Sequence, residues 1–129
     1  MRARILLIED NEQNRYLATF LLEKHGCVVV HAPDGPAGLA RARQERFDLI
    51  LLDIQLPGMD GYEVARALRT DPAVADVPIV AVTSYAMVGD REKSIASGCT
   101  GYIEKPINPD TFVAEIRRHL RPPGGGAEP

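Results

Sequence analysis

The sequence has little cysteine, no net excess of positive charge and no long apolar stretch, and each of these absences excludes a class of function. The two cysteines, Cys27 and Cys99, lack the paired spacing of a zinc site or a redox CxxC motif. We therefore expect both to be buried free thiols. The formal net charge of −3 supplies no broad basic surface, so direct nucleic-acid binding through phosphate contacts is not expected.

The N-terminal segment MRARILLIED has a four-residue apolar run before two acids, too short for a signal peptide or a membrane-spanning helix. We therefore expect a cytoplasmic protein without membrane insertion. Hydrophobic residues make up 45% of the chain and charged residues 26%, as in ordinary globular domains. We expect one domain over residues 1–121, followed at 122–129 by a tail, PPGGGAEP, that is disordered or a linker stub.

Four continuous apolar runs and a weaker fifth predict strands that are buried on both faces of a sheet. The runs span residues 5–8, 28–30, 49–52 and 79–82, with the weaker one at 102–103. Segments of helical character alternate with them, at 11–25, 35–46, 61–70 and 86–97. A last helix is expected to begin with Asn108 as its cap and Pro109 in its first position. This alternation predicts an α/β fold with a five-stranded parallel sheet and helices on both faces.

Polar side chains come directly after four of the five predicted strands. The set comprises Glu9, Asp10, Asp53, Thr83 and Lys105. Because parallel strands end at the same edge of a sheet, where α/β proteins bind ligands, we expect these side chains to converge. Crowded carboxylates repel by roughly 4 kcal/mol per pair at a separation of about 4 Å and an effective dielectric near 20, so we expect a bound cation. Hard oxygen ligands favour Mg²⁺ or Mn²⁺, held directly by Asp10 and Asp53 and through water by Glu9.

A metal-bound carboxylate can attack a phosphoryl group and form an acyl phosphate, and Asp53 is the best candidate nucleophile. Lys105 would neutralise the phosphoryl oxygens, and Thr83 would offer a hydroxyl donor. Taken singly, Asp10 is more often a helix cap, Thr83 a routine strand-end residue and Lys105 a solvated charge. Asp53 is different, because a carboxylate at the end of the apolar segment LILLD needs either an interaction partner for its charge or a functional role. The joint placement of these residues at one edge favours phosphoryl chemistry.

Across residues 4–120 the sequence resembles the receiver domains of response regulators from two-component systems, in particular single-domain regulators and the receivers of hybrid kinases. The resemblance rests on LLIEDN, LLDIQLPGMDG, AVTSYAM and GYIEKPI, in this order and spacing. It implies a flavodoxin-like (βα)5 fold with strand order 2-1-3-4-5 and phosphorylation at Asp53. It also implies that the backbone carbonyl of Gln55 binds the metal, that a cis peptide bond precedes Pro106, and that Tyr102 is an aromatic switch residue acting with Thr83.

The same resemblance implies a function in phosphorelay signal transduction. Asp53 would accept a phosphoryl group from a histidine kinase or a histidine phosphotransfer protein. Phosphorylation would shift a two-state population and change the surface of the fourth helix, fifth strand and fifth helix, to which a downstream protein target binds. The chain would then be a phosphoacceptor switch, monomeric or weakly dimeric, and not an enzyme beyond self-phosphorylation and self-dephosphorylation.

Other functions stay open on the sequence alone. A flavodoxin-like electron carrier or a dinucleotide-binding protein needs a phosphate cradle after the first strand, where this chain has EDNEQN. An aspartate-nucleophile phosphatase usually has a second aspartate two residues after the nucleophile, where this chain has Gln55. The chain could also be the excised receiver of a hybrid histidine kinase, or a receiver that binds partners without being phosphorylated.

Overall fold

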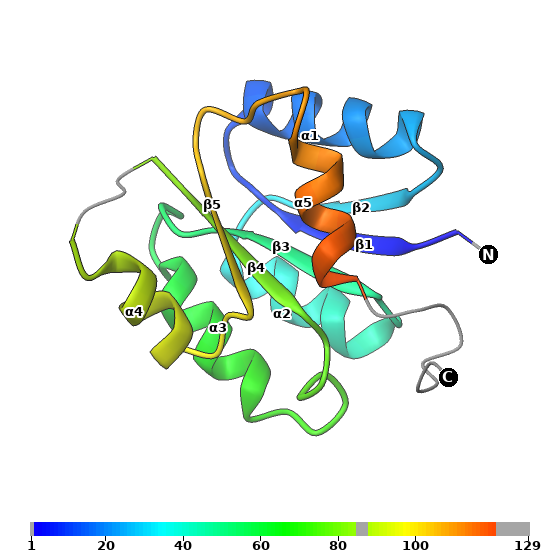
Figure 1. Ribbon diagram of the computed structural model, residues 1–129. Helices are drawn as coiled ribbons and strands as arrows, with labels where there is room; N and C mark the ends of the chain where they lie inside the picture. Colours follow the sequence, from blue (N-terminus) through cyan, green and yellow to red (C-terminus); the bar gives the residue numbers. More distant parts are fainter. Residues whose placement is uncertain (1, 85–87, 121–129) are drawn as a thin grey trace, which may run out of the picture.

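Strands and helices alternate five times in the computed structural model, which describes residues 2–84 and 88–120 (Figure 1). The strands are β1 (Arg4–Ile8), β2 (Val28–Ala32), β3 (Leu49–Asp53), β4 (Ile79–Thr83) and β5 (Gly101–Glu104). The helices are α1 (Glu12–Lys24), α2 (Gly35–Gln44), α3 (Gly61–Arg69), α4 (Asp90–Ala96) and α5 (Phe112–His119). All strand pairs are parallel and the order is β2-β1-β3-β4-β5, which confirms the predicted fold. The expected tail at 122–129 lies outside the described residues.

The apolar runs form strands whose successive side chains point to opposite faces of the sheet, so each run supplies two separate layers of the core. In β1, Leu6 belongs to the cluster that α2 and α3 cover, whereas Ile5 belongs to the cluster that α1 and α5 cover. Every residue of β3 and β4 is buried. Figure 1 shows α1 and α5 on one side of the sheet and α2, α3 and α4 on the other.

Three helices, α1, α2 and α3, begin close to the carboxyl edge of the sheet with side-chain caps; in α2, Asp34 accepts from the Ala37 backbone N–H at 2.8 Å. Asn11 precedes α1, and its side-chain oxygen accepts a hydrogen bond from the Asn14 backbone N–H at 2.9 Å. Asp60 precedes α3 and forms a capping box with Glu63, in which each side chain accepts from the backbone N–H of the other residue. Such caps satisfy backbone donors that the helix itself leaves unpaired, and they fix where the chain leaves the strand ends.

The last two helices begin later than the sequence predicts. The backbone of Gly89 has a φ of +92°, which is outside the helical range, so α4 begins only at Asp90. The start predicted at residue 86 lies outside the described residues, but the helix does not include Gly89. In front of α5, the side chain of Asn108 accepts from the Asp110 N–H at 2.9 Å and forms a separate turn. The first regular helical residue is therefore Phe112.

The two cysteines are buried and free, as expected. Burial raises the pKa of the Cys99 thiol to about 11, so this thiol stays protonated and unreactive in the folded domain. The described helices, those of residues 2–84 and 88–120, include none that combines the length and apolar character needed to cross a bilayer.

Candidate functional site

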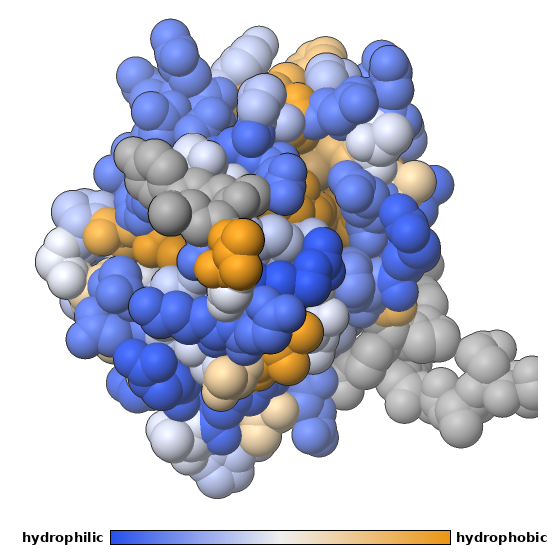
Figure 2. All heavy atoms as spheres, turned by 60° about the vertical axis from the view of Figure 1, so that its left-hand side comes forward, coloured by the Kyte–Doolittle hydropathy of each residue, from blue (hydrophilic) through white to orange (hydrophobic). Residues whose placement is uncertain are grey.

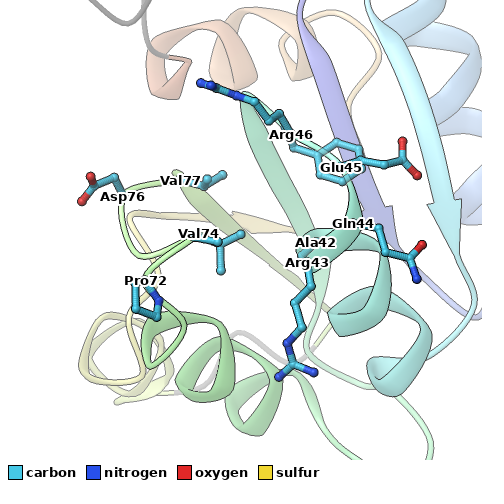
Figure 3. Close-up of a pocket in the computed structure, with 11 residues that line it drawn as sticks. Ala42, Arg43, Gln44, Glu45, Arg46, Pro72, Val74, Asp76 and Val77 are labelled. Atoms are coloured by element: carbon cyan, nitrogen blue, oxygen red, sulfur yellow. The ribbon is translucent and has the colours of Figure 1, made fainter.

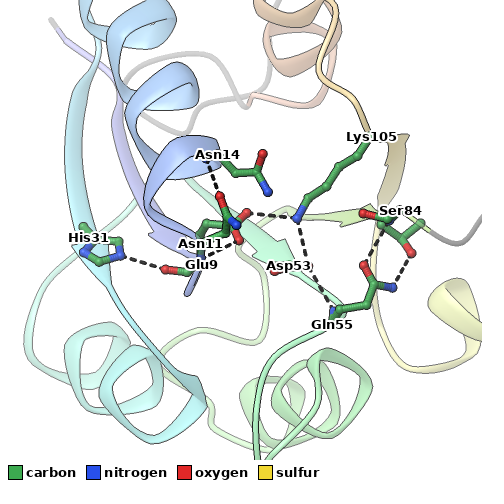
Figure 4. A network of polar contacts seen from close by, with 9 residues as sticks. Glu9, Asn11, Asn14, His31, Asp53, Gln55, Ser84 and Lys105 are labelled. Carbon is green, nitrogen blue, oxygen red and sulfur yellow. Dashed lines mark hydrogen bonds and ion pairs between the residues drawn. The ribbon is translucent and has the colours of Figure 1, made fainter.

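The polar residues that end the strands meet around a cavity of about 240 Å³ at the carboxyl edge of the sheet. Figure 4 shows the side chains that come together there from the ends of β1, β3, β4 and β5. The cavity is lined by Asp10, Asn11, Asn14, Asp53, Gln55, Ser84 and Lys105. This convergence is the arrangement that the parallel sheet predicts, since all its strands end at this edge.

Three carboxylates form the centre of the site. One oxygen from each of Glu9, Asp10 and Asp53 lies within 4.8 Å of the others. Glu9 is 4% exposed and Asp53 is 3% exposed, whereas Asp10 faces solvent. Buried carboxylates this close together need a positive charge beside them.

Lys105 supplies that charge within the protein. Its ammonium nitrogen lies 3.2 Å from Glu9 Oε1 and 3.3 Å from Asp53 Oδ1, and its side chain is 9% exposed (Figure 4). The Lys105 backbone N–H donates to the Thr83 carbonyl at 2.7 Å, which fixes the start of the connection after β5. The peptide bond between Lys105 and Pro106 is cis, the isomer expected for it.

The pKa of Glu9 is raised from its ordinary value of 4.5 to about 7. Burial is the main cause, because it disfavours the charged form, and the neighbouring Asp53 adds to it through a hydrogen bond and its charge. Lys105 and the Asn11 N–H, which donates to Glu9 Oε2 at 3.2 Å, act in the opposite direction. The single ammonium group therefore does not fully compensate the acidic pair near neutral pH. A divalent cation bound by oxygen ligands would complete the compensation.

The Gln55 side chain makes contacts that the sequence did not predict. Its Nε2 donates to Thr83 Oγ1 at 2.5 Å, and its Oε1 accepts from the Ser84 backbone N–H at 3.0 Å. The Gln55 backbone N–H also donates to Asp53 Oδ1 at 3.0 Å. The amide therefore joins the loop after β3 to the end of β4. The family resemblance implies only a backbone role for Gln55, as a metal ligand, and this role stays a prediction.

His31 is a second residue that sequence reasoning did not place at the site. Its Nε2 lies 2.8 Å from the Glu9 carbonyl oxygen, and Arg15 Nη1 lies 3.4 Å from its Nδ1. Figure 4 shows this contact on the far side of the acidic cluster from Lys105. Because β2 pairs with β1 in register, with Leu7 opposite His31, the imidazole reaches the residue that follows β1. The contact holds the backbone of Glu9 in place.

Tyr102, the expected switch residue, does not line the acidic cavity. It lies in β5, partly buried against the same core cluster that α2 and α3 cover. The Arg91 guanidinium of α4 stacks on its ring, 5.0 Å from the centroid. A rearrangement of the Tyr102 ring would therefore change its contact with Arg91 of α4. This geometry does not support a direct role of Tyr102 in the chemistry at Asp53.

A larger cavity, of about 380 Å³, lies at the opposite edge of the sheet, between the loops that precede β3 and β4 (Figure 3). Its lining is polar, but several of its charges already have partners. Glu45 forms ion pairs with both Arg4 and Arg41, and Arg43 lies 3.2 Å from Asp71. Among the described residues, the carboxylates that come together as a potential metal site are at the other edge. We therefore take the smaller cavity as the functional one.

Comparisons with known proteins show which family the chain is similar to. The family model for the response regulator receiver domain matches residues 5–117. The polar-differentiation response regulator DivK of Brucella anthropi is 40% identical over 120 residues, which cover 93% of this chain and 98% of that protein. The crystallised chemotaxis protein CheY4 of Vibrio cholerae matches with a TM-score of 0.89 and 32% identity, over 93% of this chain and 100% of that one. The receiver domain of the sensor histidine kinase PA1611 from Pseudomonas aeruginosa PAO1, solved with a magnesium ion coordinated in its active site cleft, gives a TM-score of 0.85 and 34% identity, over 92% and 98% of the two chains.

Proposed function

Because this chain belongs to the response regulator receiver domain family and acts in two-component signalling, we propose that it is a phosphorylation switch with Asp53 as the phosphoryl acceptor. The donor would be a phosphohistidine on a histidine kinase or a phosphotransfer protein in the cytoplasm. The observation that carries the proposal is the position of Asp53: it is buried at the cavity, grouped with Glu9 and Asp10, and in contact with Lys105.

The donor atoms at the site fit a Mg²⁺ ion. Three carboxylates offer the hard oxygen ligands that this ion prefers, and the pKa of Glu9, raised mainly by burial and further by Asp53, favours an added positive charge at the cluster. We propose that Asp10, Asp53 and the Gln55 carbonyl bind the ion, with Glu9 acting through water. When bound, it would neutralise charge on the phosphoryl group during transfer. The magnesium ion in the related PA1611 receiver supports this assignment.

The proposed reaction moves one phosphoryl group from nitrogen to oxygen. An Asp53 carboxylate oxygen attacks phosphorus, a P–O bond forms, and the P–N bond breaks with its electron pair passing to the imidazole of the donor. The Lys105 ammonium already lies 3.3 Å from Asp53 Oδ1, so it can contact an oxygen of the transferred group with a small movement. Thr83 ends β4, paired beside β3, and would offer its hydroxyl to the same group.

The acyl phosphate would persist until water attacks it, and we propose no turnover of any external substrate. The position two residues after the acceptor supports this, because the Gln55 amide cannot act as a general acid or base as an aspartate would. Its amide is also engaged with Thr83 and Ser84. The domain would therefore be a switch with at most self-phosphorylation and self-dephosphorylation activity.

Phosphorylation would act on a downstream protein through the surface of α4, β5 and α5. Figure 2 shows the side of the molecule on which α4 lies, where apolar side chains are scattered among hydrophilic ones. Val88 and Ile95, just before and within α4, are large hydrophobic residues that remain exposed. The Arg91 contact with Tyr102 joins this helix to β5. A partner could cover these residues without disturbing the acidic cavity.

Intact mass measurement tests the proposed function. The protein would be incubated with Mg²⁺ and acetyl phosphate, or with a phosphorylated histidine kinase, and we expect a gain of about 80 Da, the mass of one phosphoryl group. The gain should disappear after hydroxylamine treatment and in Asp53→Asn, but not in Asp110→Asn, whose carboxylate is exposed outside the cavity. Absence of the adduct with every donor would favour a receiver that binds its partner without phosphorylation.

A further inference from the structure

The side-chain amide of Gln55 engages two groups next to the phosphoryl-acceptor position at once. Its NH₂ donates to the Thr83 hydroxyl oxygen at 2.5 Å, and its carbonyl accepts from the Ser84 N–H at 3.0 Å (Figure 4). The orientation of the amide follows from chemistry, because a backbone N–H can only donate, and so the oxygen of Gln55 must face Ser84. The two contacts therefore fix a single orientation of the Gln55 amide.

The same two groups face the site where a phosphoryl group would arrive. Gln55 and Ser84 both line the cavity that contains Asp53, and Thr83 precedes Ser84 at the end of the neighbouring strand. A phosphoryl group brings three strong acceptor oxygens, which need N–H and O–H donors around them. The Ser84 N–H already donates to Gln55, and the Gln55 NH₂ holds the Thr83 oxygen. The Thr83 hydroxyl keeps its own proton to donate, but the contact with Gln55 fixes the position of its oxygen. A phosphoryl group could therefore accept from the Ser84 N–H, and draw the Thr83 hydroxyl toward itself, only after the Gln55 amide releases both.

We infer that the Gln55 side chain is an internal placeholder that holds Thr83 and Ser84 in their unphosphorylated arrangement and opposes the switch. The inference rests on the proposed function at Asp53 and adds a positioning residue to it. The placeholder role belongs to the side chain, whereas the predicted metal contact belongs to the backbone carbonyl of the same residue. Substitution of the side chain therefore separates the two roles.

The test is a comparison of two affinities in the full chain, for Mg²⁺ alone and for beryllofluoride, an analogue of the bound phosphoryl group, at saturating Mg²⁺. Gln55→Met keeps the length and the backbone but makes neither hydrogen bond. We expect it to bind beryllofluoride about three- to tenfold more tightly, since two modest hydrogen bonds no longer have to be broken. Its affinity for Mg²⁺ should stay within about twofold of the original.

Two further variants make the result specific. Gln55→Asn keeps the amide but is one methylene shorter, so it cannot span both partners and should change the beryllofluoride affinity in the same direction. Gln44→Met makes the same substitution at an exposed position at the end of α2 and should leave both affinities unchanged. In the ligand-free protein, the amide proton signal of Ser84 should move upfield in both Gln55 variants, which reports the lost hydrogen bond directly.

Unchanged or weaker beryllofluoride binding in Gln55→Met, with the Ser84 signal shifted, would overturn the placeholder role. It would mean that the amide is neutral or assists phosphoryl binding. A different failure identifies the proposed function as the error: if the original protein binds neither Mg²⁺ nor beryllofluoride and gains no mass from phosphodonors, Asp53 is not an acceptor at all.

Discussion

Mg²⁺ binding should depend strongly on pH between 6 and 8 because of Glu9. Its pKa of about 7 means that about nine tenths of the molecules carry a deprotonated Glu9 at pH 8, but only about a tenth at pH 6. A metal ion must displace the proton from the protonated molecules before the acidic cluster can bind it. The apparent affinity for Mg²⁺ should therefore fall about tenfold from pH 8 to pH 6 and change little above pH 8.

The same shift predicts the direction of the stability change. The pKa of Glu9 is higher in the folded protein than its ordinary value of 4.5, so the protonated form favours the fold. This contribution is fully present below pH 4.5 and is lost as the pH rises through about 7. Without metal, the loss attributable to Glu9 is about 3 kcal/mol at most. Saturating Mg²⁺ should remove this loss of stability, because the ion stabilises the deprotonated cluster.

Calorimetric titration in two buffers with different ionisation enthalpies measures both the affinity and the protons released. We expect about one proton released per Mg²⁺ at pH 6 and almost none at pH 8.5. Glu9→Gln should abolish the release and flatten the pH profile, while Glu12→Gln, which changes an exposed carboxylate at the start of α1, should leave both intact. A flat profile in the original protein, or release that survives Glu9→Gln, would refute the assignment of the raised pKa to this residue.

Three other predictions concern the scaffold. Gly61→Ala should lower the free energy of unfolding in urea by about 1–3 kcal/mol, because an added Cβ would lie 2.6 Å from the Cα of Ile54, a backbone atom that has little room to move. Arg69→Met should lower the free energy of unfolding, measured by thermal unfolding, by about 2–3 kcal/mol. The reason is that the Arg69 guanidinium donates to the Gly98 carbonyl at 2.8 Å and to carbonyls of the loop before β4. The same substitution at the exposed arginines of α5 should lower it by less than about 0.5 kcal/mol. Cys99 should resist alkylation at pH 8 until the domain unfolds, because its buried thiol has a raised pKa, and modification of the native protein would contradict its burial.

The acidic cluster could be predicted because strand direction alone brings its members together. Asp10, Asp53 and Lys105 each follow an apolar run, and a parallel sheet places all such positions at one edge. The contact of Gln55 with Thr83 is of another kind, because it depends on the paths of two loops after their strands end. Neither hydrophobic periodicity nor spacing encodes those paths, so only the backbone role of Gln55 could be anticipated.

Helix starts were less predictable than strand ends because several residues near each start can cap. Asn108 has the right chemistry for a cap, but its oxygen is used within a turn that precedes α5. Gly89 falls inside the helix predicted at 86–97, but its backbone is left-handed and α4 begins only after it, at Asp90. His31 lies in the edge strand β2, and pairing of β2 with β1 brings its ring to the Glu9 carbonyl, which no local sequence signal indicates. The Asn108 turn and the Gly89 backbone are local choices among several acceptable conformations, whereas the His31 contact depends on strand pairing.

The groups proposed to receive the phosphoryl group already have partners inside the unphosphorylated domain. Lys105 pairs with Glu9 and Asp53, while Thr83 and the Ser84 N–H are held by the Gln55 amide. Phosphorylation would therefore exchange one set of ionic and hydrogen-bonding partners for another. The free energy of the switch would be the difference between the total interaction free energies of the two sets, which are similar in size. A small difference of this kind keeps both states accessible, as a population shift requires. It also explains why a single amide next to the acceptor can tune the balance: a change of about 1.4 kcal/mol in either set alters the population ratio tenfold.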